Sequence, residues 1–475
     1  MAVVGLSVET DNLGMRKRNY TMRGITAIMA MALFTMCAKK TAGVETGKPA
    51  GDTTIVINPT NPTDPIIDCT YTVPASQWQV DGAKIAAGSV LCIPAGKRGA
   101  LLLKNLKGTA DKPIIIINKG GQVTFTAAAS AGYTFKTQNC QYFKIMGNGA
   151  PGIKYGLVVN GGNIGMTMDD LSSDFEIQNI EVRNSGFAGI MAKTDPTCDV
   201  TTQRGHFTMK NVFLHDNYVH KTGGEGFYVG NSFYKDGVSV ACGNVLPHDV
   251  VNARIYNNIT DSTGCEGIQV GSAVSGCEIY GNTVKSPGRT PFASGQNNGI
   301  QIGEGTGGKC YNNLIKNAPG NGIIVLGLGD NLVFNNYILN SGDNGIFADS
   351  RYTPGPGFRF INNTIVAPAS DGIKLDSETI PMNTVINNVI INPGSGTAVF
   401  KKSSIVKVTV SYNYTNKDIN TCRFIDYPNG DFHLQSSSPL INAGADVSSY
   451  GVVFDFYNST RPSGNGFDIG ATEFK

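Results

Sequence analysis

A short pattern repeats along the middle of this chain and constrains its fold more than any other feature. Each unit is an Asn, seven further residues, a polar residue, and then Gly-Ile-x-Val or a close variant. Asn313 and Asn336 are 23 residues apart, and similar units begin at Asn217, Asn258 and Asn363. A short β pattern at this period is typical of a solenoid, because one coil cannot bury its apolar face alone.

Strand alternation indicates which residues of each unit face the core. The Ile and Val positions of Gly-Ile-x-Val should point inward, since neighbouring strand side chains point to opposite faces. These positions are apolar in every unit: Ile190/Ala192, Phe227/Val229, Ile268/Val270, Ile300/Ile302, Ile323/Val325, Ile346/Ala348 and Ile373/Leu375. A second strand precedes each Asn. We expect the Asn side chains to form an internal ladder, each amide bonding the coil above.

The repeats resemble those of the right-handed parallel β-helices found in polysaccharide lyases, polygalacturonase-like hydrolases and uronan epimerases. The resemblance covers about residues 85–415. It implies an all-β, single-stranded, right-handed parallel β-helix with an N-terminal cap. The stretch from Asp431 to Phe474 resembles the closing segment of many exported bacterial β-helix proteins. That resemblance implies a C-terminal capping segment that covers the open edge of the last coil.

The first residues have the pattern of a targeting segment. Arg16, Lys17, Arg18 and Arg23 precede an apolar run over 25–36 that is too short to span a bilayer comfortably. Leu33 to Cys37 resembles a bacterial lipobox, which implies a lipid anchor at Cys37. We therefore expect export to the periplasm, to the outer membrane as a lipoprotein, or to the extracellular medium.

The predicted organisation has four parts. A signal segment covers 1–37, and a linker with the start of the N-terminal cap covers 38–74. The β-helix follows over 75–415, and the C-terminal capping segment over 416–475. Export permits disulfides, for which Cys69 with Cys92 and Cys198 with Cys242 are candidate pairs, although spacing does not give connectivity.

The composition and the motifs reduce the number of functions that this chain could have. The formal charge is +2 and no basic stripe with interleaved aromatics occurs, so the sequence gives no case for nucleic-acid binding. No phosphate-binding loop, dinucleotide fingerprint or His-Glu-x-x-His zinc motif is present. Charged residues make up 16% of the chain, and its 59 glycines suit tight turns at coil corners. We expect a monomer whose partner is a polysaccharide or oligosaccharide, with membrane contact only through the anchor.

Two long insertions, 194–206 and 231–250, mark the candidate site. Both follow a Gly-Ile-x-Val strand, so they should rise on one side of the solenoid as the walls of a cleft. They carry Arg204, Tyr234 and His248, which we predict to bind substrate. On the outward columns beside them we predict three more substrate-binding residues: Tyr228, Gln269 and Gln301.

Glu225 and Glu266 occupy one ladder position on adjacent coils. If both side chains point outward, they share a proton or hold a cation. The alternative is that both are ladder residues, like the Asn residues at the same position on other coils. A uronate lyase needs a base for the C5 proton and a cation for the carboxylate. Lys193, Arg183, His220 or Lys221 would then act as base or acid, and Glu225, Glu266 and Glu304 would bind Ca²⁺.

Three functions remain open at the sequence level. The first is β-elimination on an acidic glycan, for which the predicted catalytic set is Lys193, His220, Glu225, Glu266 and Arg183. The second is a glycoside hydrolase that uses Glu225 and Glu266 as its carboxyl pair. The third is a non-catalytic surface scaffold that binds glycans.

Overall fold

A computed structural model describes residues 68–351 and 355–475. The predicted signal segment at 1–37, the lipid anchor at Cys37 and the linker up to residue 67 lie outside the described residues. Within the described ranges, no helix is long and apolar enough to cross a membrane.

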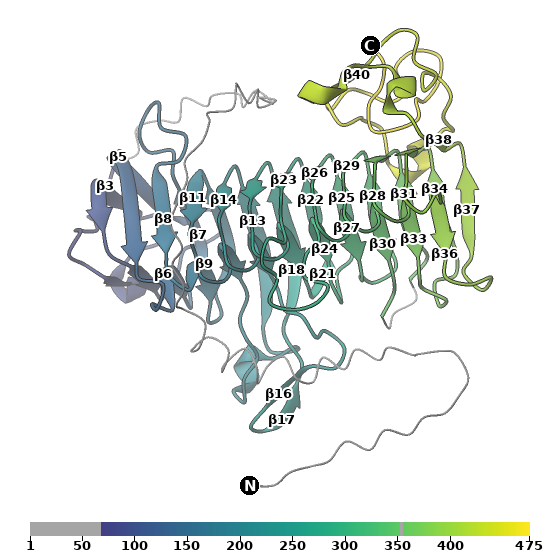
Figure 1. The fold of residues 1–475 in the computed structure, drawn as a ribbon. Coiled ribbons are helices and arrows are strands. Elements are labelled where there is room, and N and C mark those ends of the chain that lie inside the picture. The colour runs from purple at the N-terminus through teal and green to yellow at the C-terminus, as the bar shows by residue number, and fades with distance from the viewer. Residues whose placement is uncertain (1–67, 352–354) are drawn as a thin grey trace, which may run out of the picture. The chain divides into compact units, whose positions relative to one another are not determined.

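The chain winds into a right-handed parallel β-helix, as the repeats predicted (Figure 1). A typical coil has three short strands, and each pairs in parallel with its counterpart on the next coil. We call the three resulting surfaces faces 1, 2 and 3. The sequence patterns indicated faces 1 and 3, whereas the strand directly after each Asn, which forms face 2, was not predicted.

Face 1 contains β1 (Tyr71–Thr72), β3 (Val90–Arg98), β5 (Ile114–Ala127), β7 (Gln141–Met146), β10 (Ser173–Gln178), β13 (Thr208–His215), β18 (Asp249–Tyr256), β21 (Ala273–Ser275), β22 (Glu278–Tyr280), β25 (Lys309–Tyr311), β28 (Leu332–Phe334), β31 (Arg359–Ile361), β34 (Asn383–Ile386) and β37 (Val408–Ser411). Face 2 contains β8 (Leu157–Gly161), β11 (Ile180–Arg183), β14 (Tyr218–His220), β19 (Ile259–Asp261), β23 (Thr283–Lys285), β26 (Leu314–Lys316), β29 (Tyr337–Leu339), β32 (Thr364–Val366), β35 (Val389–Ile391) and β38 (Tyr414–Asn416).

Face 3 contains the Gly-Ile-x-Val strands: β2 (Gln79–Asp81), β4 (Leu101–Lys104), β6 (Tyr133–Gln138), β9 (Ile164–Asp169), β12 (Ile190–Ala192), β15 (Phe227–Val229), β20 (Ile268–Val270), β24 (Ile300–Ile302), β27 (Ile323–Val325), β30 (Ile346–Ala348), β33 (Ile373–Leu375) and β36 (Val399–Lys401). Outside the coils lie the hairpins β16 (Val238–Val240) with β17 (Gly243–Val245) and β39 (Phe424–Asp426) with β40 (Asp431–Leu434). Short 3-10 turns occur at η2 (Gly82–Lys84), η3 (Val200–Thr202), η4 (Ile419–Cys422), η5 (Tyr427–Asn429) and η6 (Ser448–Tyr450).

The core is one continuous apolar column inside the coils. The predicted inward residues are buried in it, with Ile190, Phe227, Ile268 and Ile300 all 0% exposed. Ile268 pairs with Ile300 across the insertion at 285–297, so the register of face 3 survives that insertion. Each fully buried apolar side chain contributes on the order of 1.5–3 kcal/mol, and the same contribution recurs on every coil.

The predicted Asn ladder is present at the corner between faces 1 and 2. Each side-chain amide donates to the amide oxygen of the next coil at 2.9–3.1 Å, along Asn217, Asn258, Asn282, Asn313, Asn336, Asn363, Asn388 and Asn413. The same oxygens accept backbone N–H groups at the turn, as Asn363 does from Asn336 at 3.1 Å. The ladder therefore satisfies polar groups that the turn would otherwise bury without partners.

The residue before each ladder Asn adopts a left-handed conformation. Asn257, Asn312 and Asn335 have φ values of 54°, 53° and 53°. Asn tolerates this region better than most residues with a side chain. The Asn-Asn pairs in the sequence therefore have two functions, one in backbone geometry and one in hydrogen bonding.

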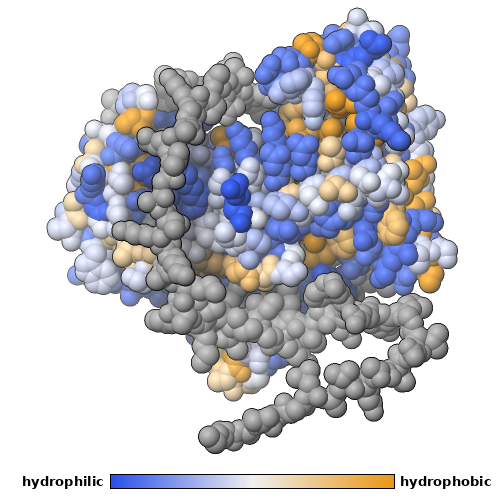
Figure 2. Space-filling model, in the orientation of Figure 1, coloured by the Kyte–Doolittle hydropathy of each residue, from blue (hydrophilic) through white to orange (hydrophobic). Residues whose placement is uncertain are grey.

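The C-terminal segment 416–475 lies along the sides of the later coils (Figures 1 and 2). Its Phe432 and Phe456 pack on outward residues of face 2 such as Tyr337, and its Phe467 packs in the cluster on face 1. The expectation that it covers the edge of the last coil needs correction, because Tyr412, beside β37, stays 59% exposed. The segment covers the outer surfaces of faces 1 and 2 instead.

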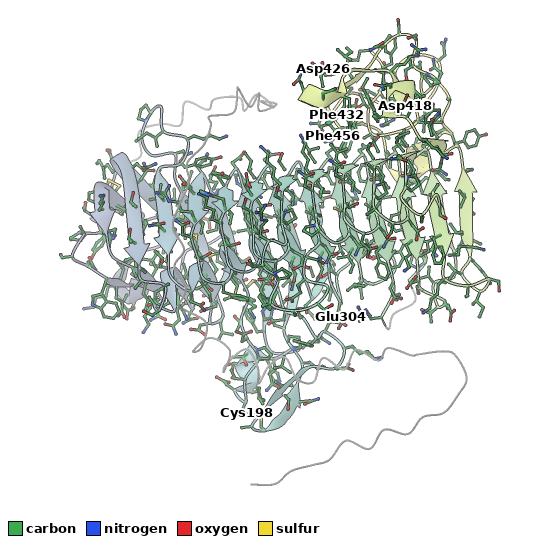
Figure 3. The ribbon with its side chains drawn as sticks, in the orientation of Figure 1. Cys198, Glu304, Asp418, Asp426, Phe432 and Phe456 are labelled. Atoms are coloured by element: carbon green, nitrogen blue, oxygen red, sulfur yellow. A yellow bond between two sulfur atoms is a disulfide. The ribbon has the colours of Figure 1, made fainter. Side chains whose placement is uncertain are left out.

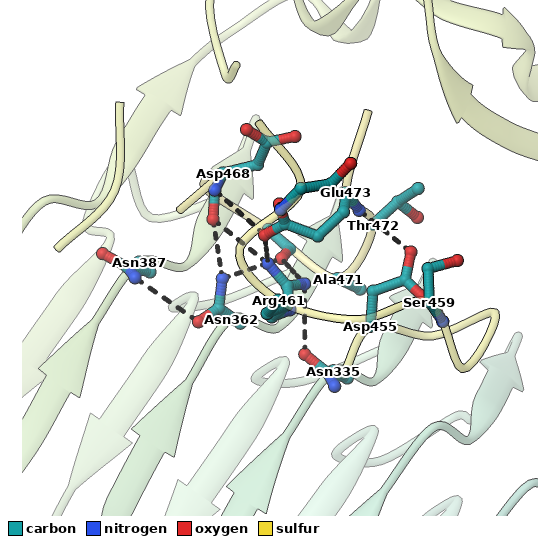
Figure 4. A network of polar contacts seen from close by, with 12 residues as sticks. Asn335, Asn362, Asn387, Asp455, Ser459, Arg461, Asp468, Ala471, Thr472 and Glu473 are labelled. Carbon is teal, nitrogen blue, oxygen red and sulfur yellow. Dashed lines mark hydrogen bonds and ion pairs between the residues drawn. The ribbon is translucent and has the colours of Figure 1, made fainter. Parts of the chain in front are cut away.

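A buried polar network around an ion pair fixes the segment to the coils (Figure 4). The Arg461 guanidinium pairs with Glu473, and both side chains are 0% exposed. Arg461 also donates to Asn335 Oδ1 at 3.2 Å. Asn362 donates from the next coil to the backbone oxygens of Asp468 and Gly470 at 2.9 and 3.0 Å. At the other end of the described chain, Cys69 and Cys92 form the predicted disulfide.

Replacing one ladder residue tests the ladder. We expect Asn336→Ala to lower the free energy of unfolding by about 2–4 kcal/mol, because buried donors and acceptors on both neighbouring coils lose a partner. Urea denaturation followed by circular dichroism measures the change. Asn244→Ala is the control, since Asn244 is exposed and makes one weak 3.4 Å bond. Equal losses in the two variants would contradict the role of the ladder.

Candidate functional site

The two predicted insertions leave face 3 from neighbouring strands, β12 and β15, and Cys198 marks the first insertion in Figure 3. They are tied together by the predicted disulfide Cys198–Cys242. Arg204 donates to the Tyr234 backbone oxygen at 2.8 Å, and its guanidinium lies 3.7 Å from the centroid of the Tyr234 ring. Arg204 also pairs with Asp249 at 3.2 Å. Arg204 and Tyr234 therefore brace the insertions, and their predicted contact with substrate stays a prediction.

His248 lies beneath these insertions and is 0% exposed. Its Nε2 accepts from the Thr194 backbone N–H at 3.0 Å, and its Nδ1 lies 2.9 Å from the Asp249 backbone oxygen. Burial lowers the pKa of His248 to about 4. Both ring nitrogens are thus engaged by the protein, so His248 joins the two insertions as a neutral imidazole and offers no free nitrogen to a substrate.

Lys193 begins a row of polar side chains on the outer side of face 3. Its ammonium lies 2.7 Å from Asp195 and 4.7 Å from the centroid of the Tyr228 ring, and the side chain is 13% exposed. Burial by itself would lower the pKa of Lys193, but Tyr228, Asp195 and Glu225 outweigh burial and raise it. Lys193 is therefore a charged ammonium.

The row continues over the next coils through pairs that the sequence columns predicted. Met191 pairs with Tyr228, Tyr228 with Gln269, and Gln269 with Gln301. The Tyr228 hydroxyl lies 3.1 Å from Ser232 Oγ, and Gln269 Nε2 donates to the same oxygen at 3.3 Å. Gln301 is half-buried. Lys193, Tyr228, Gln269 and Gln301 thus form a continuous strip, which we call the face 3 row.

Glu225 and Glu266 lie one coil apart, but they do not reach the surface. They are 1% and 0% exposed. Their position continues a second Asn ladder, in which Asn298, Asn321 and Asn344 are linked by bonds of 2.9 Å. Asn298 Nδ2 donates to Glu266 at 3.0 Å. The outward orientation considered from the sequence is wrong, and the ladder position is the observed one.

Burial changes the protonation of these two carboxyls. It raises the pKa of Glu225 and of Glu266, and the charge of Glu225 raises the pKa of Glu266 further. One oxygen of each carboxyl is buried without a hydrogen-bond partner. The expected calcium group is not assembled as a whole, because the ligand cluster in the described chain joins Glu225 and Glu266 to Cys265, without Glu304.

Arg183 and His220 lie on face 2, away from the face 3 row. Arg183 pairs with Glu181 at 2.7 Å, and His220 Nε2 lies 3.0 Å from the same carboxyl. The His220 ring stacks on Tyr218 with centroids 4.2 Å apart. The structure therefore brings these two predicted catalytic residues together, but on strands of a different face from Lys193 and Tyr228.

Two groups of residues were not singled out from the sequence. Asp349 and Asp376 follow paired strands β30 and β33 on face 3 and are both half-buried. Burial raises the pKa of Asp349, and the neighbouring carboxylate of Asp376 adds to this effect. The positive charge of Arg351 offsets it only in part. The sequence did contain a signal for this pair, because an Asp occurs at the same position, directly after the Gly-Ile-x-Val unit, on both coils. On face 1 an aromatic stack with centroids 4.5–4.9 Å apart runs through His215, Tyr256, Tyr280, Tyr311 and Phe334.

Comparisons with known proteins agree with the fold. A family model described as a right handed beta helix region matches residues 236–415. The structure resembles pectate lyase Pel9A at 15% identity, over 83% of this chain and 90% of that chain, with a TM-score of 0.45. It resembles an alginate lyase from Paenibacillus sp. at 14% identity, over 73% and 100% of the two chains, with a TM-score of 0.40.

A third similar structure is the A-module of the mannuronan C-5 epimerase AlgE6 from Azotobacter vinelandii. Its identity is 12%, over 69% of this chain and 91% of that chain, with a TM-score of 0.38. No curated protein matches the sequence. The chain is a right-handed parallel β-helix protein, and likenesses this distant carry no argument about its chemistry.

Because His248 is neutral in the folded chain, the free energy of unfolding should fall as the pH is lowered. Its folded pKa of about 4 lies below the ordinary value of 6.5, so the unfolded chain takes up the proton first as the pH falls. Its contribution is complete above pH 6.5 and is lost as the pH falls to about 4. The full loss is roughly 3 kcal/mol.

Thermal unfolding between pH 7.5 and 4 measures this effect. We expect His248→Gln to flatten the fall in midpoint over this range. His206→Gln is the control, because His206 is exposed in the neighbouring insertion, and it should follow the unmodified chain. An unchanged pH profile in His248→Gln would contradict the assignment.

Proposed function

We propose that this chain is an exported enzyme that acts on an acidic, uronate-containing polysaccharide along face 3, most simply as a lyase. The observation that carries the proposal is the face 3 row, where the Lys193 ammonium is followed on successive coils by Tyr228, Gln269 and Gln301. Successive coils are spaced by about 4.8 Å, so the polar groups of the row recur at regular intervals, as an extended chain of sugars requires. Lys193 and Gln301 are partly exposed, whereas Tyr228 and Gln269 are 8% and 2% exposed and lie against Ser232 of the second insertion.

The arrangement of the faces supports this placement. The C-terminal segment covers outward residues of faces 1 and 2 on the later coils. The aromatic stack on face 1 has its rings nearly parallel, within 16° between neighbours, so its inner members face one another rather than a sugar. Both braced insertions, in contrast, leave from face 3 and lie beside the row.

β-Elimination on a uronate requires the C5 proton to move to a base while the C4–oxygen bond breaks and the departing oxygen takes up a proton. In the proposed mechanism the charged Lys193 neutralises the uronate carboxylate, which favours loss of the C5 proton. The Tyr228 hydroxyl lies beside Lys193 and is hydrogen-bonded to Ser232. It gives its proton to the departing oxygen while its own oxygen takes up the C5 proton, so the hydroxyl is restored at the end of the step. Gln269 and Gln301 bind sugar hydroxyls.

The other residues that the sequence predicted to be catalytic have smaller roles in this proposal, or none. Glu225 acts from beneath the row by stabilising the charge of Lys193, and Glu266 takes no step here. Arg183 and His220 have no contact with the row and take no step here. Calcium dependence, export and a monomeric state stay predictions, which the experiment below includes as conditions.

The test is a degradation screen of the purified full chain on acidic and neutral polysaccharides, with and without calcium. We expect unsaturated-uronate absorbance and reducing ends to rise together on an acidic glycan. Lys193→Ala should lower kcat by about 100-fold or more, since the neutralising charge is lost in the transition state. Lys210→Ala is the control, because Lys210 is exposed on face 1. Unchanged kcat in Lys193→Ala would reject the site.

A hydrolase is the second candidate, and Asp349 with Asp376 is the observation that favours it. These carboxyls lie one coil apart on face 3, and the raised pKa of Asp349 suits a general acid. A separation near one strand spacing, about 5 Å, matches a retaining mechanism. The hydrolase reading at Glu225 and Glu266 is less favoured, because both carboxyls are buried away from any sugar.

If the screen shows reducing ends without unsaturated product, we expect Asp349→Asn and Asp376→Asn each to lower kcat by about 1000-fold. Asp343→Asn is the matched control, because Asp343 is an exposed carboxylate of the β29–β30 turn. Absence of both products, with glycan binding retained and lost in Tyr228→Ala, would identify a binding scaffold instead of an enzyme.

A further inference from the structure

The interior of the β15–β20 corner holds a side-chain cluster that the proposed function does not use for chemistry. Carboxylate oxygens of Glu225 and Glu266 and the Sγ of Cys265 all lie within 4.8 Å of one another. The three residues are 1%, 0% and 0% exposed. One oxygen of Glu225 and one of Glu266 have no hydrogen-bond partner.

The surroundings hold this cluster in place. Asn298 Nδ2 donates to the other Glu266 oxygen at 3.0 Å, which orients that carboxyl. The insertion at 286–297 folds over the cluster, with Gly288 N–H donating to the Cys265 backbone oxygen at 2.8 Å. From this insertion, the Gln296 side-chain oxygen lies 4.0 Å from Cys265 Sγ. Two carboxyls and one thiol therefore converge on one buried point, and the carboxamide oxygen of the half-buried Gln296 approaches it from the thiol side.

A hydrogen-bonded ladder of side-chain amides would not require two carboxyls and a thiol at these positions. Elsewhere in the same column Asn298, Asn321 and Asn344 each donate to and accept from a neighbour. A carboxyl has no N–H group with which to continue such a ladder. Buried polar oxygens without a partner are costly, and a cation or a proton must compensate them. Neither carboxyl is ion-paired to an Arg or Lys in the described chain.

We propose that Glu225, Cys265 and Glu266 bind one zinc-class divalent ion, with Gln296 as the fourth ligand. Zn²⁺ accepts carboxylate and thiolate ligands in a four-coordinate site, at about 2.0–2.3 Å. Calcium is a poorer match, because it takes six to eight oxygen ligands and has no preference for sulfur. On binding, the Cys265 S–H bond breaks, the sulfur–metal bond forms, and the thiol proton leaves to solvent together with any proton held by the two carboxyls.

The ion would act as a structural clip, a role separate from the polysaccharide chemistry proposed above. Its ligands come from two coils and from the covering insertion, so the ion would fix residues 286–297 against β15 and β20. Asn298 is then the residue outside the ligand set that orients Glu266.

The experiment measures metal content of the full chain, purified without chelators from zinc-supplemented medium and rinsed briefly with a chelator to remove surface ions. We expect about one zinc per chain. Cys265→Ser and Glu266→Gln should each lower that content by about tenfold or more. Glu266→Gln resembles its Asn neighbours in the column, so it keeps the test valid if Cys265→Ser does not fold.

The matched control is Cys310→Ser, since Cys310 is also a fully buried free thiol but lies in the apolar core. It should keep its zinc. Cobalt substitution adds a spectroscopic readout, because a thiolate ligand gives a sulfur-to-cobalt charge-transfer band that Cys265→Ser must abolish. Unmodified chain without bound zinc, equal zinc loss in Cys310→Ser, or a band that persists in Cys265→Ser would each overturn the proposal.

Discussion

The hydrogen bond that passes from one Asn side chain to the next holds this structure in register. Each ladder amide both donates to the following coil and accepts from the preceding one, as Asn313 does between Asn282 and Asn336. The turn between faces 1 and 2 is buried, so its backbone groups depend on these side chains rather than on water. Because the ladder permits only one register, every outward residue acquires a defined neighbour on the next coil.

Because the register is fixed, a coil that carries a different residue at a ladder position has different chemistry at that one place. At the corner before face 3 the same type of ladder occurs with Asn298, Asn321 and Asn344, but two coils carry Glu225 and Glu266 instead. A carboxylate is longer than the Asn amide and donates no hydrogen bond, so the ladder is interrupted at these coils. The interruption lies where both long insertions leave face 3 and where the 286–297 insertion folds over the corner.

The outer surfaces of the three faces differ in whether another part of the chain covers them, and the residues that they carry explain why. On the later coils, faces 1 and 2 carry outward apolar residues such as Phe334 and Leu339, which the C-terminal segment covers. Arg461, which is buried in an ion pair with Glu473, fixes that segment through its hydrogen bond to Asn335. Removing one partner of such a pair leaves an uncompensated charge. Face 3 carries Lys193, Gln301, Asp349 and Lys374 in its outer columns and is the face from which the braced insertions rise.

The sequence by itself determined the coil, the inward residues and the Asn ladder, because these depend on local spacing and on a pattern repeated at every turn. It placed Tyr228, Gln269 and Gln301 in one column for the same reason. The two disulfides were candidates only, and the structure decided their pairing. Only the tertiary structure decided that Glu225 and Glu266 are buried and that His248 braces two insertions. It also decided that the C-terminal segment covers the sides of the coils. Those outcomes depend on how insertions of irregular length fold back over the coils, and no repeating pattern encodes such contacts.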